Sequence, residues 1–167
     1  FRSFDLPGRS KGRVVLTVAV PKEALEASYN GSLILTAFTS ESEEPVSQKI
    51  VPLAVLVGTN HLYQVELRSV QAEKTEEGHL LSLDITNTGN VDLAPMADVV
   101  ISNTAGEFVE RAALTMPEDA LKVIPLQKLQ LAGTAEGLSP GSYNIRITLS
   151  DGSREILSTE MPLDVGE

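Results

Sequence analysis

Short runs in which apolar residues alternate with other residues dominate the sequence, and this alternation has the period of a β-strand. The run over residues 13–20 ends at Pro21 and puts four apolar side chains on one face, Val14, Leu16, Val18 and Val20. Further strands are predicted over residues 33–38, 50–57, 63–67, 80–86, 97–102 and 143–149, with a return strand over 154–165. Residues 121–131 are predicted to be extended because Pro125 interrupts their helical spacing. The pattern indicates an all-β fold.

Turn residues separate these runs. Asn30-Gly31 predicts a turn or a bulge, residues 87–90 (Asn-Thr-Gly-Asn) predict a turn, and Asp151-Gly152 predicts a tight hairpin. Residues 58–60 (Gly-Thr-Asn) are the best linker, because they separate an apolar strand from a new alternating run.

An internal repeat is the most informative feature of the sequence. Ser-Tyr-Asn at residues 28–30, followed by Val-Pro-Leu-Ala-Val at 51–55, recurs as Ser-Tyr-Asn at 142–144, followed by Met-Pro-Leu-Asp-Val at 161–165. The order is the same in both copies, and a difference of a few residues in loop length is easily tolerated. The repeat predicts that one β-unit is used twice.

The strand count predicts two immunoglobulin-like β-sandwich domains, of which the first lacks its N-terminal strands. From Tyr63 onward, about seven short strands fall within roughly 100 residues, which is the outline of an immunoglobulin-like sandwich. The predicted domains are residues 1–58, the C-terminal half of one sandwich, and residues 59–167, a complete one. A half sandwich leaves apolar faces and edges open, so we expect an N-terminal segment or another chain to complete it.

Composition narrows the function classes. The chain has 167 residues, 42% of them hydrophobic, and a formal net charge of −10, which disfavours nucleic acid and anionic membrane surfaces as partners. Without cysteine there is no disulfide, thiol nucleophile or thiolate metal site. No apolar run is long enough to span a bilayer. The first residue is Phe1 rather than Met, so the chain is expected to begin inside a longer precursor.

Three stretches resemble known modules. Residues 83–91 (Leu-Asp-Ile-Thr-Asn-Thr-Gly-Asn-Val) and 137–143 (Gly-Leu-Ser-Pro-Gly-Ser-Tyr) resemble motifs of immunoglobulin-like modules in prokaryotic envelope proteins. Residues 6–10 and the strand that ends at Pro21 are similar to a stretch of PapD-like pilus-chaperone domains and of WxL-interacting surface proteins. The resemblance implies a tandem immunoglobulin-like fold outside the cytoplasm, in the periplasm or at the cell surface. The paired basic residues with which pilus chaperones hold a subunit's carboxylate have no clear counterpart.

Catalytic, cofactor and metal sites are not predicted. His61 and His79 stand beside predicted turns without a companion histidine, so both are expected to be exposed loop residues. Acidic clusters around residues 41–44, 73–77 and 118–119 lack the spacing of a calcium-binding loop and are expected to be solvated loops. Weak surface calcium binding is the alternative for these clusters. No serine-nucleophile or phosphate-binding motif is present, which argues against an enzyme.

Two pairs of residues in the repeat have predicted structural roles. Tyr29 and Tyr143 are expected to form the hydrogen-bonded corner at the start of a late sandwich strand. Pro52 and Pro162 are expected on edge strands, where a missing amide donor prevents unwanted pairing.

The favoured function is a non-catalytic binding or scaffold module that presents loops and strand edges to another protein or to a surface polymer. One alternative is a pilus-type assembly chaperone that lends a strand by β-augmentation, with Val14, Leu16, Val18 and Val20 on the lent edge. Another is an accessory domain of a surface hydrolase.

Overall fold

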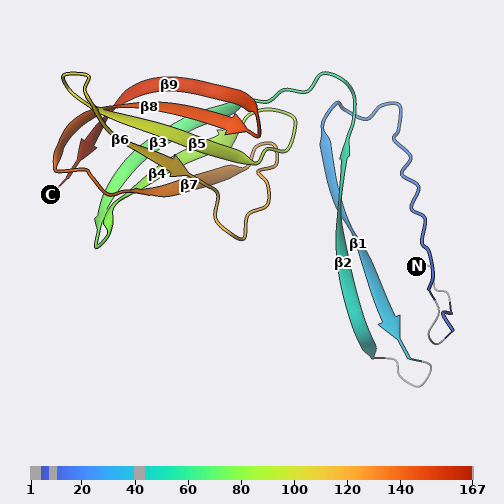
Figure 1. Cartoon of the computed structure of the whole chain (residues 1–167). Helices are drawn as coiled ribbons and strands as arrows, with labels where there is room; N and C mark the ends of the chain where they lie inside the picture. The colour runs from blue at the N-terminus through green and yellow to red at the C-terminus, as the bar shows by residue number, and fades with distance from the viewer. Residues whose placement is uncertain (1–4, 8–10, 40–43, 167) are drawn as a thin grey trace.

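The computed structural model describes residues 5–7, 11–39 and 44–166, which form nine β-strands and no helix (Figure 1). The strands are β1 (Ser28–Phe38), β2 (Pro45–Leu56), β3 (Val65–Thr75), β4 (Gly78–Asn87), β5 (Pro95–Asn103), β6 (Phe108–Leu114), β7 (Lys128–Ala135), β8 (Gly141–Asp151) and β9 (Arg154–Val165). The prediction of an all-β fold is confirmed.

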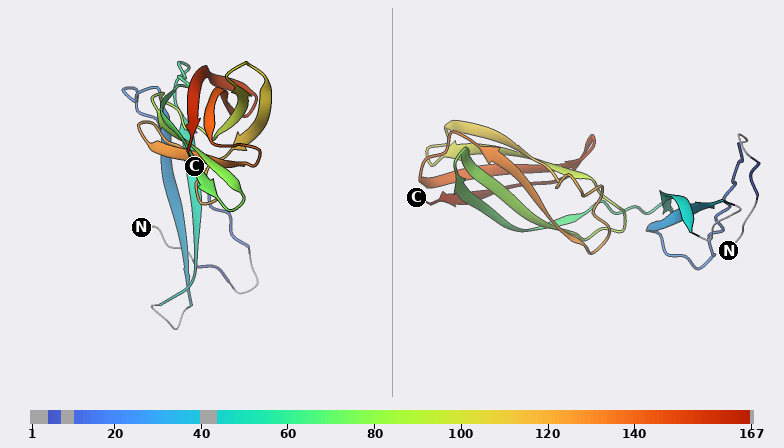
Figure 2. Two further views of the ribbon diagram at one scale, coloured as in Figure 1. Left: turned by 90° about the vertical axis from the view of Figure 1, so that its left-hand side faces the viewer. Right: turned by 90° about the horizontal axis from the view of Figure 1, so that it is seen from below.

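Seven of these strands form a β-sandwich. One sheet has the order β3-β4-β7 and the other the order β6-β5-β8-β9, with every paired strand antiparallel. The two views in Figure 2 show these sheets stacked as two layers. Pro162 lies on β9, the last strand of its sheet, as expected of a residue that cannot donate to a ladder.

The hydrophobic core lies between the two sheets and follows the alternation of the strands. In β4 the inward positions are His79, Leu81, Leu83 and Ile85, and all four are buried. In β8 they are Ile145, Ile147 and Leu149, none of which is more than 1% exposed. Because side chains in a strand alternate between faces, one residue in two supplies the core.

A buried asparagine organises the loop after β4. The side-chain amide of Asn87 donates to the carbonyl oxygens of Val91 at 2.8 Å and Val123 at 2.9 Å, while its oxygen accepts from the amide of Gly89 at 3.0 Å. Asn87 is 0% exposed, so these bonds satisfy backbone groups that water cannot reach. The predicted turn at residues 87–90 is therefore built around one polar side chain.

The two remaining strands form a separate hairpin. Within the described residues, β1 and β2 pair only with each other, and the hairpin projects from one end of the sandwich (Figure 1). Among the described residues, every buried apolar side chain belongs to Val65 or a later residue. The described part of the hairpin therefore has no core of its own. A two-stranded hairpin without such a core is only marginally stable in water.

Three predictions about local structure need correction. Residues 13–20 form no strand, because none of the segments that the structure describes pairs with them. Asn30-Gly31 is not a turn but lies within β1, paired with Ala54 and Leu53. Residues 121–131 are not continuously extended, because a turn with Leu126 at a positive φ of 67° precedes β7.

Candidate interaction surface

The hairpin and the segment before it carry most of the exposed large apolar side chains of the described residues. Fourteen of the twenty large apolar side chains exposed in the described residues precede residue 58. Single exposed apolar side chains are ordinary on a soluble protein, but a concentration of them in one part of the chain is typical of an interaction site. We call residues 11–57 the open unit.

One face of the hairpin continues the alternation seen in the sandwich. Opposite residues of a strand pair share a face, and Tyr29 pairs with Val55 while Leu33 pairs with Val51. Leu53, opposite Gly31, lies on the same face. These positions form an apolar stripe along the hairpin, and none of the described strands packs a second sheet against it.

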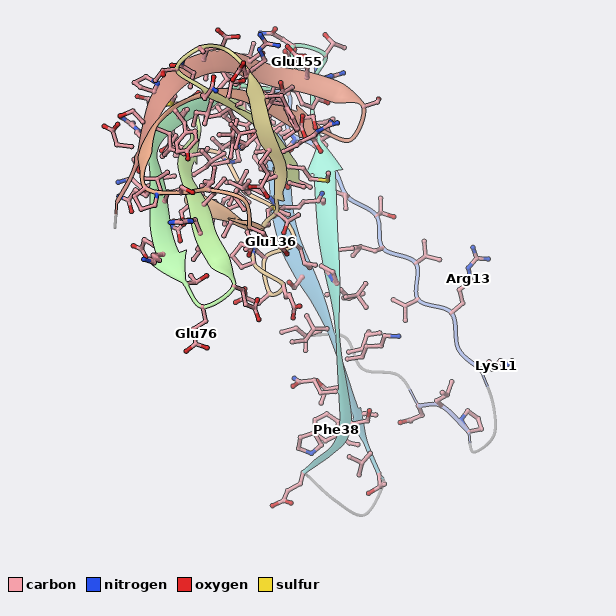
Figure 3. The ribbon with its side chains drawn as sticks, turned by 60° about the vertical axis from the view of Figure 1, so that its left-hand side comes forward. Lys11, Arg13, Phe38, Glu76, Glu136 and Glu155 are labelled. Atoms are coloured by element: carbon pink, nitrogen blue, oxygen red, sulfur yellow. The ribbon has the colours of Figure 1, made fainter. Side chains whose placement is uncertain are left out.

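The four residues predicted to form a strand edge lie on the extended segment, residues 11–20, which is not a strand. Val14, Leu16, Val18 and Val20 are 50%, 50%, 55% and 47% exposed. Val15, on the opposite face, is 76% exposed. The segment runs along the side of the hairpin that faces away from the sandwich, and Lys11 and Arg13 project from it (Figure 3).

The base of the hairpin is joined to the sandwich by hydrogen bonds centred on Asn90. The side-chain amide of Asn90 donates to the carbonyl oxygens of Glu26 at 2.7 Å and Asn60 at 2.9 Å, and its oxygen accepts from the amide of Leu62 at 2.7 Å. The amide of Ser28 donates to the Asn90 carbonyl at 3.0 Å.

Two further contacts extend this joint along β1. The amide of Asp92 donates to the Ser28 hydroxyl at 3.0 Å, and the Asn30 side chain donates to the Asp92 carboxylate at 3.1 Å. The linker predicted at residues 58–60 therefore lies in a bonded joint. Gly58 has a positive φ of 83°, which favours glycine at this position.

The two repeated tyrosines make the same hydrogen bond. The Tyr143 hydroxyl donates to the carbonyl oxygen of Ser139 at 2.9 Å and accepts from the Ser139 amide at 3.1 Å. The Tyr29 hydroxyl donates to the carbonyl oxygen of Leu25 at 3.0 Å, again four residues earlier. Each tyrosine thus ties the start of its strand to the preceding corner.

His79 contradicts the sequence prediction. It is not an exposed loop residue but is only 5% exposed at the start of β4, and neither ring nitrogen has a hydrogen-bond partner within the described ranges. The signal was available in the alternation, because His79 precedes Leu81 and Leu83 at intervals of two. His61 is half-buried beside the joint.

The part of the chain that the structure describes offers no candidate metal centre. It holds no group of three or more histidine, aspartate or glutamate side chains that could bind a metal ion. Glu73, Glu76 and Glu77 lie around the β3–β4 turn, whereas residues 41–43 of the first acidic cluster fall outside the described ranges. Arg111 bonds Asp98 at 2.5 Å, which raises the pKa of the guanidinium.

Two shallow hollows lie on the sandwich. One lies on the three-stranded sheet, lined by Arg68, Asp84, Ile85, Lys128, Leu129 and Gln130. The other lies between β3 and β9, where Val65, Leu67 and Met161 contribute apolar walls. Both are open and formed by sheet edges or sheet faces, so they offer no enclosed pocket for a small molecule.

The charge of the chain is unevenly divided. Residues 59–167 contain seventeen acidic and seven basic residues, so they carry the whole formal charge of −10, whereas residues 1–58 contain six of each. Residues 1–58 therefore carry no formal net charge, whereas residues 59–167 are acidic. Among the described residues, no helix is long and apolar enough to cross a membrane.

No family model matches the chain, and no curated protein sequence matches it significantly.

Proposed function

We propose that the chain is a non-catalytic binding or scaffold module of a bacterial surface or periplasmic protein, built from two immunoglobulin-like units in tandem. The seven strands after residue 64 support this fold, because an immunoglobulin-like sandwich divides its strands between two antiparallel sheets. The corner bond of Tyr143 is a hallmark of the same class.

The observation that carries the proposal is the joint at Asn90. A flexible linker would let consecutive units move independently, which is the ordinary behaviour of domains with small interfaces. Here one asparagine bonds Glu26, Asn60 and Leu62 together, so the first unit is held at a set orientation to the second. A fixed orientation is what a module needs to present a surface at a defined distance.

The experiment measures the distance distribution between two spin labels across the joint. The chain has no cysteine, so Ser47→Cys with Ser153→Cys labels the hairpin and the β8–β9 turn specifically. Thr134→Cys with Ser153→Cys is the control pair within the sandwich. A rigid scaffold gives a distribution for the first pair as narrow as that of the control. A broad distribution contradicts the scaffold function.

A second candidate is a pilus-type assembly chaperone, favoured by the exposed and unpaired run from Val14 to Val20. An extended strand with alternating apolar residues is the form in which β-augmentation lends main-chain hydrogen bonds to a client. Mixing the protein with pilin subunits then yields a stable 1:1 complex in size-exclusion chromatography. Elution of separate components argues against this candidate.

A further inference from the structure

We propose that the open unit is the last three strands of an incomplete sandwich, and that it is completed by a four-stranded β-segment of the same polypeptide ahead of residue 1. The proposal rests on the tandem arrangement proposed above and names what covers the apolar surface of its first unit. The sandwich in the same chain serves as the template.

The hairpin β1–β2 corresponds to the hairpin β8–β9. The repeated sequences lie on the same strands in both, and each tyrosine at the start of the first strand bonds the carbonyl four residues earlier. In the sandwich, Tyr143 pairs with Leu163, whereas in the open unit Tyr29 pairs with Val55. The pairing differs by two residues, and an even shift keeps the same side chains on the same face.

The face equivalent to the core is the apolar stripe. Leu163 and Val165 are 4% and 5% exposed in the sandwich. Their counterparts Leu53 and Val55 are half-buried in the hairpin, where no opposing sheet covers them. The stripe is therefore a core face without its second layer.

The extended segment corresponds to β7. Ala135 is eight residues before Tyr143, and Val20 is nine residues before Tyr29, so one inserted residue aligns the two. Leu16 then takes the place of Leu131, which is 0% exposed, and Val15 takes the place of the exposed Gln130. The four predicted edge residues fall on the inward positions.

This correspondence explains why the segment is extended but unpaired. In the sandwich, β7 pairs in register with β4, whereas β8 and β9 belong to the other sheet. A β7 equivalent therefore pairs with neither strand of the hairpin. Its partner is a β4 equivalent, and the free edge of β1 requires a β5 equivalent.

The order of the strands along the sandwich indicates where in the sequence the equivalents of β4 and β5 would lie. β3 to β6 all precede β7, and their span is Val65–Leu114. With the same spacing, the equivalent of Leu114 falls just ahead of Phe1. The missing complement is thus a stretch of about fifty residues with four alternating strands, comparable to Val65–Leu114.

The test compares the 167-residue chain with the polypeptide extended N-terminally by the next sixty or so residues of its own reading frame. Hydrogen exchange is followed at Val14–Val20 and at β1. In the extended protein these amides are expected to exchange at least about 100-fold more slowly than in the shorter chain.

Two matched variants test the predicted face in the extended protein. Leu16→Asp buries a carboxylate and is expected to abolish the added protection, whereas Val15→Asp, on the outward face, retains it. Protection of Leu81 to Ile85 in the second sandwich confirms in both variants that this domain is folded.

Three outcomes overturn the proposal: an upstream reading frame without alternating strands, equal effects of the two variants, or protection that requires a second copy or an added pilin subunit. None of these results changes the spin-label distances in the shorter chain, so failure of this inference is distinguishable from failure of the scaffold function.

Discussion

The side-chain amide of Asn90 lies 2.7 Å from the carbonyl oxygen of Glu26, 64 residues earlier in the chain. This contact joins the segment leading into the hairpin to a loop of the sandwich. Asn90→Ala removes it together with the bonds to Asn60 and Leu62.

We expect Asn90→Ala to loosen the joint without unfolding the sandwich. Each lost hydrogen bond costs about 1 kcal/mol, so amide exchange at Ser28 and Leu62 rises by about 10- to 100-fold. Asn103→Ala is the control. The Asn103 side chain also makes three hydrogen bonds, with the amides of Ala105 and Glu107 and with the Glu107 carboxylate, but it lies away from the joint. Unchanged exchange at Ser28 contradicts the role assigned to Asn90.

Substitution of Gly89 tests the close backbone contact between the loop after β4 and the segment before β3. A Cβ atom added there would lie 2.0 Å from the carbonyl oxygen of Leu62, whereas one added at Gly31 would meet nothing within 4 Å. We expect Gly89→Ala to lower stability by about 1–3 kcal/mol, because backbone must shift. Gly31→Ala is expected to be neutral or stabilising. Chemical denaturation followed by circular dichroism measures both, and equal midpoints would show that the loop yields freely.

Substitution of the two repeated tyrosines probes the stability of the sandwich and of the hairpin independently. Tyr143→Phe removes the hydroxyl that bonds Ser139 and is expected to destabilise the sandwich by about 1 kcal/mol. Tyr29→Phe removes the bond to Leu25 and is expected to leave sandwich unfolding unchanged while speeding exchange at the hairpin base. Thermal unfolding combined with hydrogen exchange distinguishes these effects. A comparable loss of sandwich stability in both variants would mean that the two units unfold together.

Substitution of His79 is expected to leave the stability of the protein unchanged or to raise it, unlike the substitutions above. Its ring nitrogens are buried and have no hydrogen-bond partner within the described ranges, so the imidazole is desolvated without compensation. His79→Leu is expected to leave stability unchanged or raise it by about 1–2 kcal/mol. Leu81→Ala, on the same face, is expected to cost about 2–5 kcal/mol. Urea denaturation at one pH compares the two, and a loss above about 1 kcal/mol for His79→Leu would reveal a bond to the imidazole.

The sequence predicted most strands of the sandwich because each contains its own alternation and turn signals. The hairpin at Asp151-Gly152 is an example, since both strands and the turn are local. The sequence did not locate β7, because Lys128–Ala135 only partly overlaps the run 121–131 that was predicted to be extended. Val14 to Val20 carry the same alternation but form no strand, because strand formation also requires a partner. The Asn90 joint was not predictable, since its bonds link residues as many as 64 positions apart and no composition signal marks them.

The joint also determines how the module carries mechanical load. The hairpin base is connected to the sandwich twice, through the covalent link before β3 and through hydrogen bonds to the loop between β4 and β5. Tension applied at the hairpin is therefore shared between these two routes. The hydrogen bonds at Asn90 and Asp92 must rupture before the link can straighten, so a pulling experiment should record an early, small extension before either sheet of the sandwich unravels.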